Sequence, residues 1–113
     1  MMLILVCGLP GTGKTTVAEK IADKTKAYVF NTDAIRKEMF KKPAYTDKEK
    51  KMVYDLLLEM SEKFLGVAKN VVLDGTFYKK ELRDRVRDIA KRTGSAFHVV
   101  EVVCDETEVR ERM

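Results

Sequence analysis

The chain has 113 residues, of which 45% are hydrophobic and 35% are charged, and its formal net charge is +4. This length allows one domain with a real core, and the absence of any low-complexity tract excludes a largely disordered chain. No apolar stretch is long enough for a signal peptide or a membrane span, so we expect a soluble, cytoplasmic protein. The mild positive charge suits an anionic ligand but does not establish nucleic-acid binding.

The first part of the chain alternates between strand and helix patterns. Residues 2–7 form a continuous apolar run, which is typical of a central parallel strand covered on both faces. Residues 14–24 have the apolar spacing of a helix, and a short strand is predicted at residues 27–30. Residues 31–33, Asn-Thr-Asp, open a short helix that ends before the segment 41–45.

A long helix is predicted next, from Thr46 to about Ala68. Thr46 and Glu49 have the spacing of a capping box, in which each residue's side chain bonds the other's backbone N–H. The helix has one apolar face, which we interpret as core packing: Val53, Leu56, Leu57, Met60, Phe64 and Leu65.

Two further strands and one helix follow. Residues 70–74 and 97–103 are predicted strands, and residues 79–93 are an amphipathic helix that ends at Gly94. This alternation of strands and helices predicts one α/β unit with a parallel sheet and right-handed crossovers. After the last strand, Asp105 begins a second capping-box pattern that predicts a final helix, still unfinished at residue 113.

Two cysteines lie at the ends of predicted strands, Cys7 and Cys104. We interpret both as buried, reduced thiols, since cysteine is among the residues most often buried. Their separation fits no metal-ligand spacing.

The strongest motif is the segment Gly8 to Thr15, which fits the pattern G-x-x-x-x-G-K-[ST] at every fixed position. Backbone N–H groups of such a loop surround a phosphate, and the following helix adds its dipole. Lys14 would reach the β- and γ-phosphates, and the Thr15 hydroxyl would bind Mg²⁺. The expected nucleotide-binding residues are Gly8, Leu9, Pro10, Gly11, Thr12, Gly13, Lys14, Thr15 and Thr16.

Two carboxylates follow neighbouring strands at the edge where ligands bind in open parallel sheets. Asp74 ends an apolar strand and has the form of a second Mg²⁺-linked acid, although it could simply cap a turn. Asp33 could be a first-turn residue stabilised by its helix dipole. We favour a catalytic role, in which Asp33 accepts the proton of an attacking hydroxyl and Arg36, one turn later, contacts the acceptor or the phosphoryl group.

The helix 79–93 carries many basic residues, with acidic residues interleaved among them. Such a pattern favours a solvated face of ion pairs over a binding patch. Arg83 is a tentative site residue because it lies near Asp74 in the sequence. His98, near the start of its strand, is expected to be structural.

Together, the segments 8–16, 31–36 and 71–77 resemble those of the small P-loop kinases. That group includes polynucleotide 5′-hydroxyl kinases, seryl-tRNA(Sec) kinase, and zeta-toxin-like and adenylate-kinase-like enzymes. The resemblance covers essentially the whole chain and implies a three-layer P-loop NTPase sheet, mostly parallel, with strand order 2-3-1-4. It also implies ATP and Mg²⁺ as cofactors. In polynucleotide-kinase-like members, the residue matching Asp33 is the base and the residue matching Arg36 contacts the acceptor.

The resemblance is incomplete at the C-terminus, where such kinases continue into an arginine-bearing lid and a further strand. Arg110 and Arg112 would be the start of that element, so we expect residues 1–113 to form a kinase domain truncated before the lid. The predicted function is γ-phosphoryl transfer from ATP to an acceptor hydroxyl, on a nucleic-acid 5′ end, a tRNA-linked group or a small molecule. Two alternatives stay open: an ATP-binding module without turnover of its own, and a P-loop ATPase or switch.

Overall fold

The computed structural model describes residues 1–8, 13–77, 79–102 and 109–112. The strands are β1 (Met2–Cys7), β2 (Tyr28–Asn31), β3 (Val71–Asp74), β4 (Ala96–Val102) and β5 (Val109–Arg112). The helices are α1 (Lys14–Thr25), α2 (Thr32–Met39), α3 (Asp47–Gly66) and α4 (Lys80–Thr93). The strands form one sheet in the order β2-β3-β1-β4-β5, and β1 to β4 pair in parallel. The predicted order 2-3-1-4 of the first four strands is therefore confirmed.

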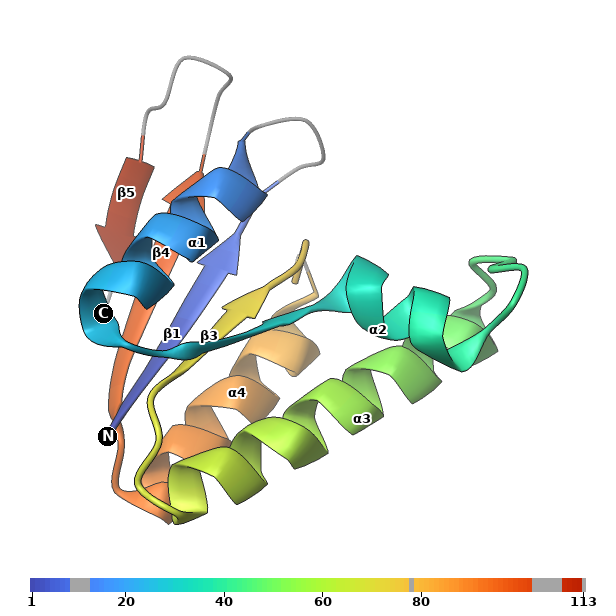
Figure 1. Ribbon diagram of the computed structural model, residues 1–113. Helices are drawn as coiled ribbons and strands as arrows, with labels where there is room; N and C mark the ends of the chain where they lie inside the picture. The colour runs from blue at the N-terminus through green and yellow to red at the C-terminus, as the bar shows by residue number, and fades with distance from the viewer. Residues whose placement is uncertain (9–12, 78, 103–108, 113) are drawn as a thin grey trace.

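The sheet is the middle of three layers, with α1 on one face and α3 and α4 side by side on the other (Figure 1). Because side chains alternate along a strand, β1 supplies both cores. Leu3 and Leu5 pack in the larger core with α3 and α4, whereas Ile4 and Val6 pack in the smaller core with α1. This explains why the β1 sequence is continuously apolar instead of alternating.

The ends of the helices follow the local signals in the sequence. Thr46 caps α3, since its Oγ1 accepts a hydrogen bond from the Glu49 backbone N–H at 3.2 Å. Gly94 ends α4 in the left-handed conformation, with φ of 66°, which a side chain would disfavour. Cys7 is buried as expected, and its thiol lies 3.8 Å from the carbonyl oxygen of Val100. Cys104 lies outside the described residues.

The predicted final helix is wrong where the structure describes it. Residues Val109–Arg112 form β5, which pairs antiparallel with β4, so that Arg110 lies opposite Glu101 and Arg112 opposite Val99. The physical reason is that β4 would otherwise be an edge strand with a row of unpaired backbone groups. Four residues hydrogen-bond to such an edge more readily than they nucleate a helix. The capping residue Asp105 lies outside the described residues.

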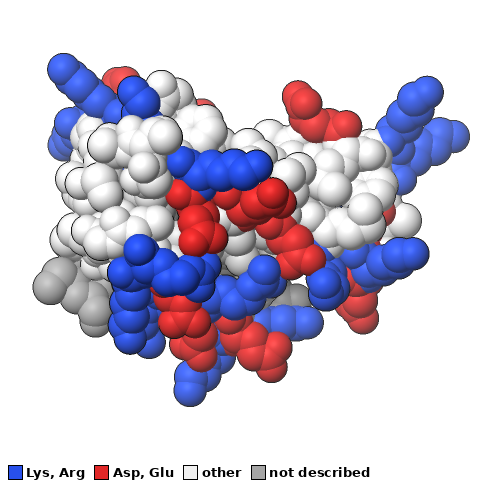
Figure 2. Space-filling model, turned by 90° about the horizontal axis from the view of Figure 1, so that it is seen from below, with Lys and Arg blue, Asp and Glu red and all other residues white. Residues whose placement is uncertain are grey.

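Charged side chains of both signs are interspersed on the face seen from below in Figure 2, with no patch of a single sign. Ion pairs link α4 to α3: Arg92 pairs with Glu62 and Arg85 with Asp55, each at 3.0 Å. The sequence predicts i,i+4 pairs along α4 itself. Within α4, among the described residues, Arg87 pairs instead with Asp84, three residues away, at 3.8 Å, and the shorter ion pairs run to α3. No helix in the described part of the chain is long and apolar enough to cross a membrane.

Candidate active site

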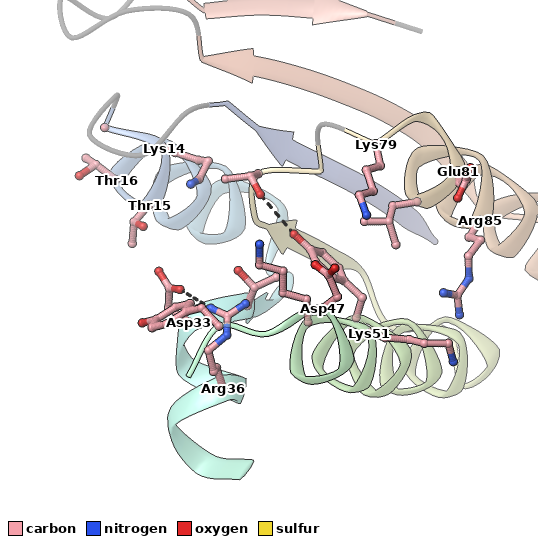
Figure 3. A pocket seen from close by; sticks show the side chains of 17 residues that line it. Lys14, Thr15, Thr16, Asp33, Arg36, Asp47, Lys51, Lys79, Glu81 and Arg85 are labelled. Atoms are coloured by element: carbon pink, nitrogen blue, oxygen red, sulfur yellow. Dashed lines mark hydrogen bonds and ion pairs between the residues drawn. The ribbon is translucent and has the colours of Figure 1, made fainter. Parts of the chain in front are cut away.

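A cavity of about 840 Å³ lies at the edge of the sheet where β1, β2 and β3 end. The N-terminal parts of α1, α2, α3 and α4 all contribute to its lining. Helices α1, α2 and α4 each follow a parallel strand and therefore begin at that edge, whereas α3 follows α2. Figure 3 shows the lining side chains, which come from all four helices. The fold thus brings together residues that are far apart in the sequence, including Lys14, Asp33 and Lys79.

The described part of the phosphate loop has the backbone that its glycines permit. Gly8 has φ of 150° and Gly13 has φ of 80°, values that side chains other than hydrogen rarely allow. Gly13, Lys14, Thr15 and Thr16 line the cavity, while residues 9–12 lie outside the described part of the chain. No side chain among the described residues caps α1, so its first N–H groups stay available to an anion.

Asp33 and Arg36 lie one turn apart on α2 and form an ion pair with each other; the predicted contact of Arg36 with the acceptor or the phosphoryl group stays a prediction. Arg36 Nη1 lies 2.8 Å from Asp33 Oδ1, and both residues line the cavity. Their environments differ sharply, because the Asp33 side chain is 70% exposed and that of Arg36 only 7%. Asp33 does not cap the helix; that role belongs to Asn31, whose Oδ1 accepts from the Ala34 N–H at 2.9 Å.

Arg36 has acidic and aromatic neighbours, but its buried Nε has no hydrogen-bond partner among the described residues. Glu49 Oε1 lies 3.7 Å from Arg36 Nε, and the ring of Tyr45 lies 4.7 Å from the guanidinium carbon. With Asp33 on Nη1, the guanidinium has protein contacts on two edges and one face. Arg36 is therefore placed to orient Asp33.

Glu49 is the main site residue that sequence reasoning missed. It was expected to return its carboxylate to the backbone of Thr46 in a capping box. Instead its two oxygens accept hydrogen bonds from the N–H groups of Ala44, at 3.0 Å, and Tyr45, at 3.2 Å. Glu49 is 6% exposed, so one buried carboxylate holds both the segment before α3 and Arg36. The capping-box pattern pointed to Glu49, but not to these partners.

Asp74 lies at the end of β3 and is fully buried. Its Oδ2 accepts a hydrogen bond from Asn31 Nδ2 at 2.7 Å, while its Oδ1 has no partner among the described residues. Asp74 is not among the residues that line the cavity. A buried acceptor without a donor fits a site that a metal-bound water would complete.

The loop after β3 is packed closely against α2. A Cβ on Gly75 would lie 2.8 Å from Phe77 Cε2 and 2.9 Å from Thr32 Cγ2, so only glycine fits there. Phe77 is fully buried and packs edge-on against Tyr54, with ring centroids 5.0 Å apart. Thr76, which lies between Gly75 and Phe77 in the sequence, lines the cavity, and its hydroxyl lies 3.3 Å from the hydroxyl of Tyr54.

The tentative arginines have different outcomes. Arg83 is half-buried and does not line the cavity, whereas Arg85 does. The rotation of α4 about its axis determines which arginine lines the cavity. Leu82 and Arg85 are one turn apart, on the side of the helix that faces the cavity. Arg110 and Arg112 lie in β5, and their proposed contacts with a nucleotide stay a prediction.

A parallel sheet ordered 2-3-1-4, with the G-x-x-x-x-G-K-[ST] segment between β1 and α1, defines a P-loop kinase fold. The sequence matches the family AAA_33, described as an AAA domain, over residues 3–113. The chain belongs to this family.

One curated relative is the uncharacterized protein Rv2004c of Mycobacterium tuberculosis (strain ATCC 25618 / H37Rv). It is 32% identical over 117 residues, which cover 93% of this chain and 23% of the relative. The chain therefore spans about a quarter of the length of the curated relatives it matches.

Solved structures of kinases share the fold. The APS kinase CysC of Mycobacterium tuberculosis (Cys556Ala mutant) superposes with a TM-score of 0.75 at 19% identity, covering 95% of this chain and 79% of that chain. The same kinase in complex with AMPPNP and APS gives a TM-score of 0.72 at 20% identity, covering 89% and 61%. A gluconokinase from Sinorhizobium meliloti 1021 gives a TM-score of 0.60 at 22% identity, covering 88% and 55%.

Proposed function

We propose that this chain is the core of an ATP-dependent phosphotransferase, which transfers the γ-phosphoryl group of ATP to an acceptor hydroxyl. The observation that carries the proposal is the exposed carboxylate of Asp33, held by Arg36 in the same cavity as Lys14. A P-loop alone would support nucleotide binding of any kind. A carboxylate anchored at the phosphate end of the cavity adds a proton acceptor for the attacking group.

In the proposed reaction, Lys14 and the N–H groups at the start of α1 hold the β- and γ-phosphates. Asp33 accepts the proton of the acceptor hydroxyl while the oxygen of that hydroxyl bonds to the γ-phosphorus. The bond from that phosphorus to the β–γ bridging oxygen breaks, and ADP leaves with the electron pair. Arg36 holds the Asp33 carboxylate in one orientation throughout, since it is itself fixed by Glu49.

The residues at this end of the cavity also fit Mg²⁺. The Thr15 hydroxyl, which lines the cavity, would hold the ion. Asp74 is fully buried outside the lining, and its Oδ1, which has no partner among the described residues, would accept a hydrogen bond from a water of the ion that reaches it beyond the lining. When bound, Mg²⁺ neutralises charge on the β- and γ-phosphates. Asn31 would keep Asp74 in place through its 2.7 Å hydrogen bond to Oδ2.

The proposal is tested by single-turnover transfer from γ-labelled ATP to a panel of hydroxyl acceptors, with ATP affinity measured in parallel. The panel holds oligonucleotides with free 5′ ends, tRNA and small polyols. Transfer to one class supports the proposal. Affinity for ATP with transfer to none of them favours a nucleotide-binding module, and release of inorganic phosphate without any acceptor favours an ATPase.

A further inference from the structure

We infer that Asn31 is a positioning residue: it connects the buried carboxylate of Asp74 to the first turn of α2, so that Mg²⁺ bound with the nucleotide fixes the orientation of Asp33. The inference rests on the proposed function, which makes Asp33 the base and gives Asp74 a contact with a water of the ion. It adds a dependence of the base on the bound ion, carried by one side-chain amide.

The Asn31 side chain has partners on two different elements. Its Nδ2 donates a hydrogen bond to Asp74 Oδ2 at 2.7 Å, at the end of β3, and its Oδ1 accepts one from the Ala34 backbone N–H at 2.9 Å, in the first turn of α2. Because an amide is planar, its oxygen and nitrogen move together. A change in the orientation of the Asp74 carboxylate is therefore passed to the start of α2.

The backbone around this contact leaves little room for α2 to move independently of β3. Asn31 and Asp74 are the last residues of β2 and β3, and they lie opposite each other in the parallel pairing. The residues that follow them are also close, since a Cβ on Gly75 would lie 2.9 Å from Thr32 Cγ2. Thr32 and Gly75 are both buried. The start of α2 is thus packed against the end of β3 and follows its position.

Asp74 is held at only one of its two oxygens by the described residues. Oδ2 accepts from Asn31, whereas the buried Oδ1 has no partner among them. A carboxylate held at one oxygen still rotates about its Cβ–Cγ bond, because that torsion is soft. A water of the ion at Oδ1 would give each oxygen a donor and fix the plane of the carboxylate. The same step fixes the Asn31 amide, whose Nδ2 is bonded to the other oxygen.

Asp33 needs such a restraint because its own packing is slight. Its side chain is 70% exposed, and the ion pair with Arg36 engages only Oδ1. Asp33 lies two residues after Asn31, in the turn that Asn31 caps. Asp74 is not among the residues that line the cavity, so its state reaches the cavity through its neighbours. The proposed base is therefore held most firmly when nucleotide and ion are both bound, which is the state in which transfer occurs.

The first test follows the side-chain amide NMR signals of the unmodified protein, saturated with AMPPNP, as Mg²⁺ is added. The sequence has two asparagines and no glutamine, so only two such signals exist, from Asn31 and Asn70. The Asn31 signal should shift saturably. Asn70 is the matched control: its Nδ2 donates to the Thr25 carbonyl at 2.8 Å and its Oδ1 accepts from the Met2 N–H at 2.9 Å, at the opposite end of β3. Its signal should stay in place.

The second test measures hydrogen exchange of the α2 amides in Asn31→Ser. Serine caps a helix about as well as asparagine but lacks the amide nitrogen that donates to Asp74. In the unmodified protein with AMPPNP, Mg²⁺ should slow exchange in the first turn of α2 by about fivefold or more. Asn31→Ser should lose this effect and keep its AMPPNP affinity within about threefold. A loss of stability alone would speed exchange equally with and without Mg²⁺, so the difference between the two conditions reports the connection.

An Asn31 signal that does not respond to Mg²⁺, or an α2 response that Asn31→Ser retains in full, would overturn the inference. Single-turnover transfer by the same variant separates this inference from the proposed function. Both responses in a protein that phosphorylates no acceptor would keep the connection between Asp74 and α2 and remove the kinase function. Transfer by Asn31→Ser at the rate of the unmodified protein would keep the kinase function and remove the positioning role of Asn31.

Discussion

Asp33 and Arg36 are joined by a 2.8 Å ion pair in which the exposed Asp33 carboxylate lines the cavity and the Arg36 side chain is buried. The Asp33 side chain is 70% exposed and that of Arg36 is 7% exposed. The ion pair engages Oδ1 of the Asp33 carboxylate. Under the proposed function Arg36 positions Asp33, and because Arg36 is buried, its contacts are measurable through the free energy of unfolding.

Arg36→Ala should lower the free energy of unfolding by about 3 kcal/mol, because it leaves the buried Glu49 carboxylate without its cation. Asp33→Asn should cost less than about 1 kcal/mol, since the exposed half of a pair contributes little. Urea denaturation of both variants checks this. Equal losses would mean that the burial of Arg36 has no energetic consequence.

Gly75→Ala should destabilise the protein by about 1–3 kcal/mol, because its Cβ would meet Phe77 Cε2 at 2.8 Å and Thr32 Cγ2 at 2.9 Å. The matched control is Gly66→Ala, at the end of α3, where a Cβ meets nothing within 4 Å. That change should be neutral or stabilising, because alanine favours helix. Thermal unfolding compares the two, and a similar fall in both melting temperatures would contradict the packing described for Gly75.

Asn31→Asp isolates the contact between Asn31 and Asp74. The aspartate can still cap α2, since a carboxylate oxygen replaces the amide oxygen that accepts from Ala34. The new aspartate cannot donate a hydrogen bond to Asp74. Its carboxylate would lie next to that of Asp74, where Asn31 now donates a hydrogen bond of 2.7 Å. We expect a loss of about 1–3 kcal/mol at neutral pH, measured by chemical denaturation and reduced in acid. A loss that is the same at both pH values would argue against the Asp74 contact.

Acid should weaken the connection between α3 and α4. The Lys51 and Arg85 contacts lower the pKa of Asp55, and the Arg92 contact lowers that of Glu62. A lowered folded-state pKa contributes stability above the unfolded value, about pH 4, and that stability is lost as the pH falls through the folded value. Asp55→Asn should flatten the dependence of stability on pH in this range. High salt should also flatten this dependence, because the ion pairs are exposed and salt screens them. If neither Asp55→Asn nor high salt changes the dependence of stability on pH, the stabilising role of these ion pairs is contradicted.

Much of the site could be predicted because its signals are local. The glycine loop, the start of α2 at residues 31–33 and the placement of Asp33 and Arg36 on one face of that helix each depend on residues within one or two helical turns. Strand order followed from the resemblance to P-loop kinases. These parts of the chain have few conformations compatible with their sequence.

The parts that could not be predicted depend on packing between distant elements. Glu49 contacts Arg36 only because α3 lies against α2, and no spacing in the sequence encodes that distance. Arg85, not Arg83, reaches the cavity because the core residues of α4 fix its rotation. The helix expected near the C-terminus is replaced by β5, where pairing with β4 outweighs a local capping pattern.

The central claim, that Lys14 binds the nucleotide and Asp33 serves the transfer step, is tested most directly by comparing Lys14→Ala with Asp33→Asn. ATP affinity is measured by calorimetry, and transfer is measured in a single turnover with the best acceptor. Lys14→Ala should weaken ATP binding by about 100-fold or more. Asp33→Asn should leave ATP affinity within about twofold and slow transfer by about 100-fold to 10,000-fold. Equal loss of ATP affinity in the two variants, or unchanged transfer in Asp33→Asn, would contradict the role of Asp33 as the base.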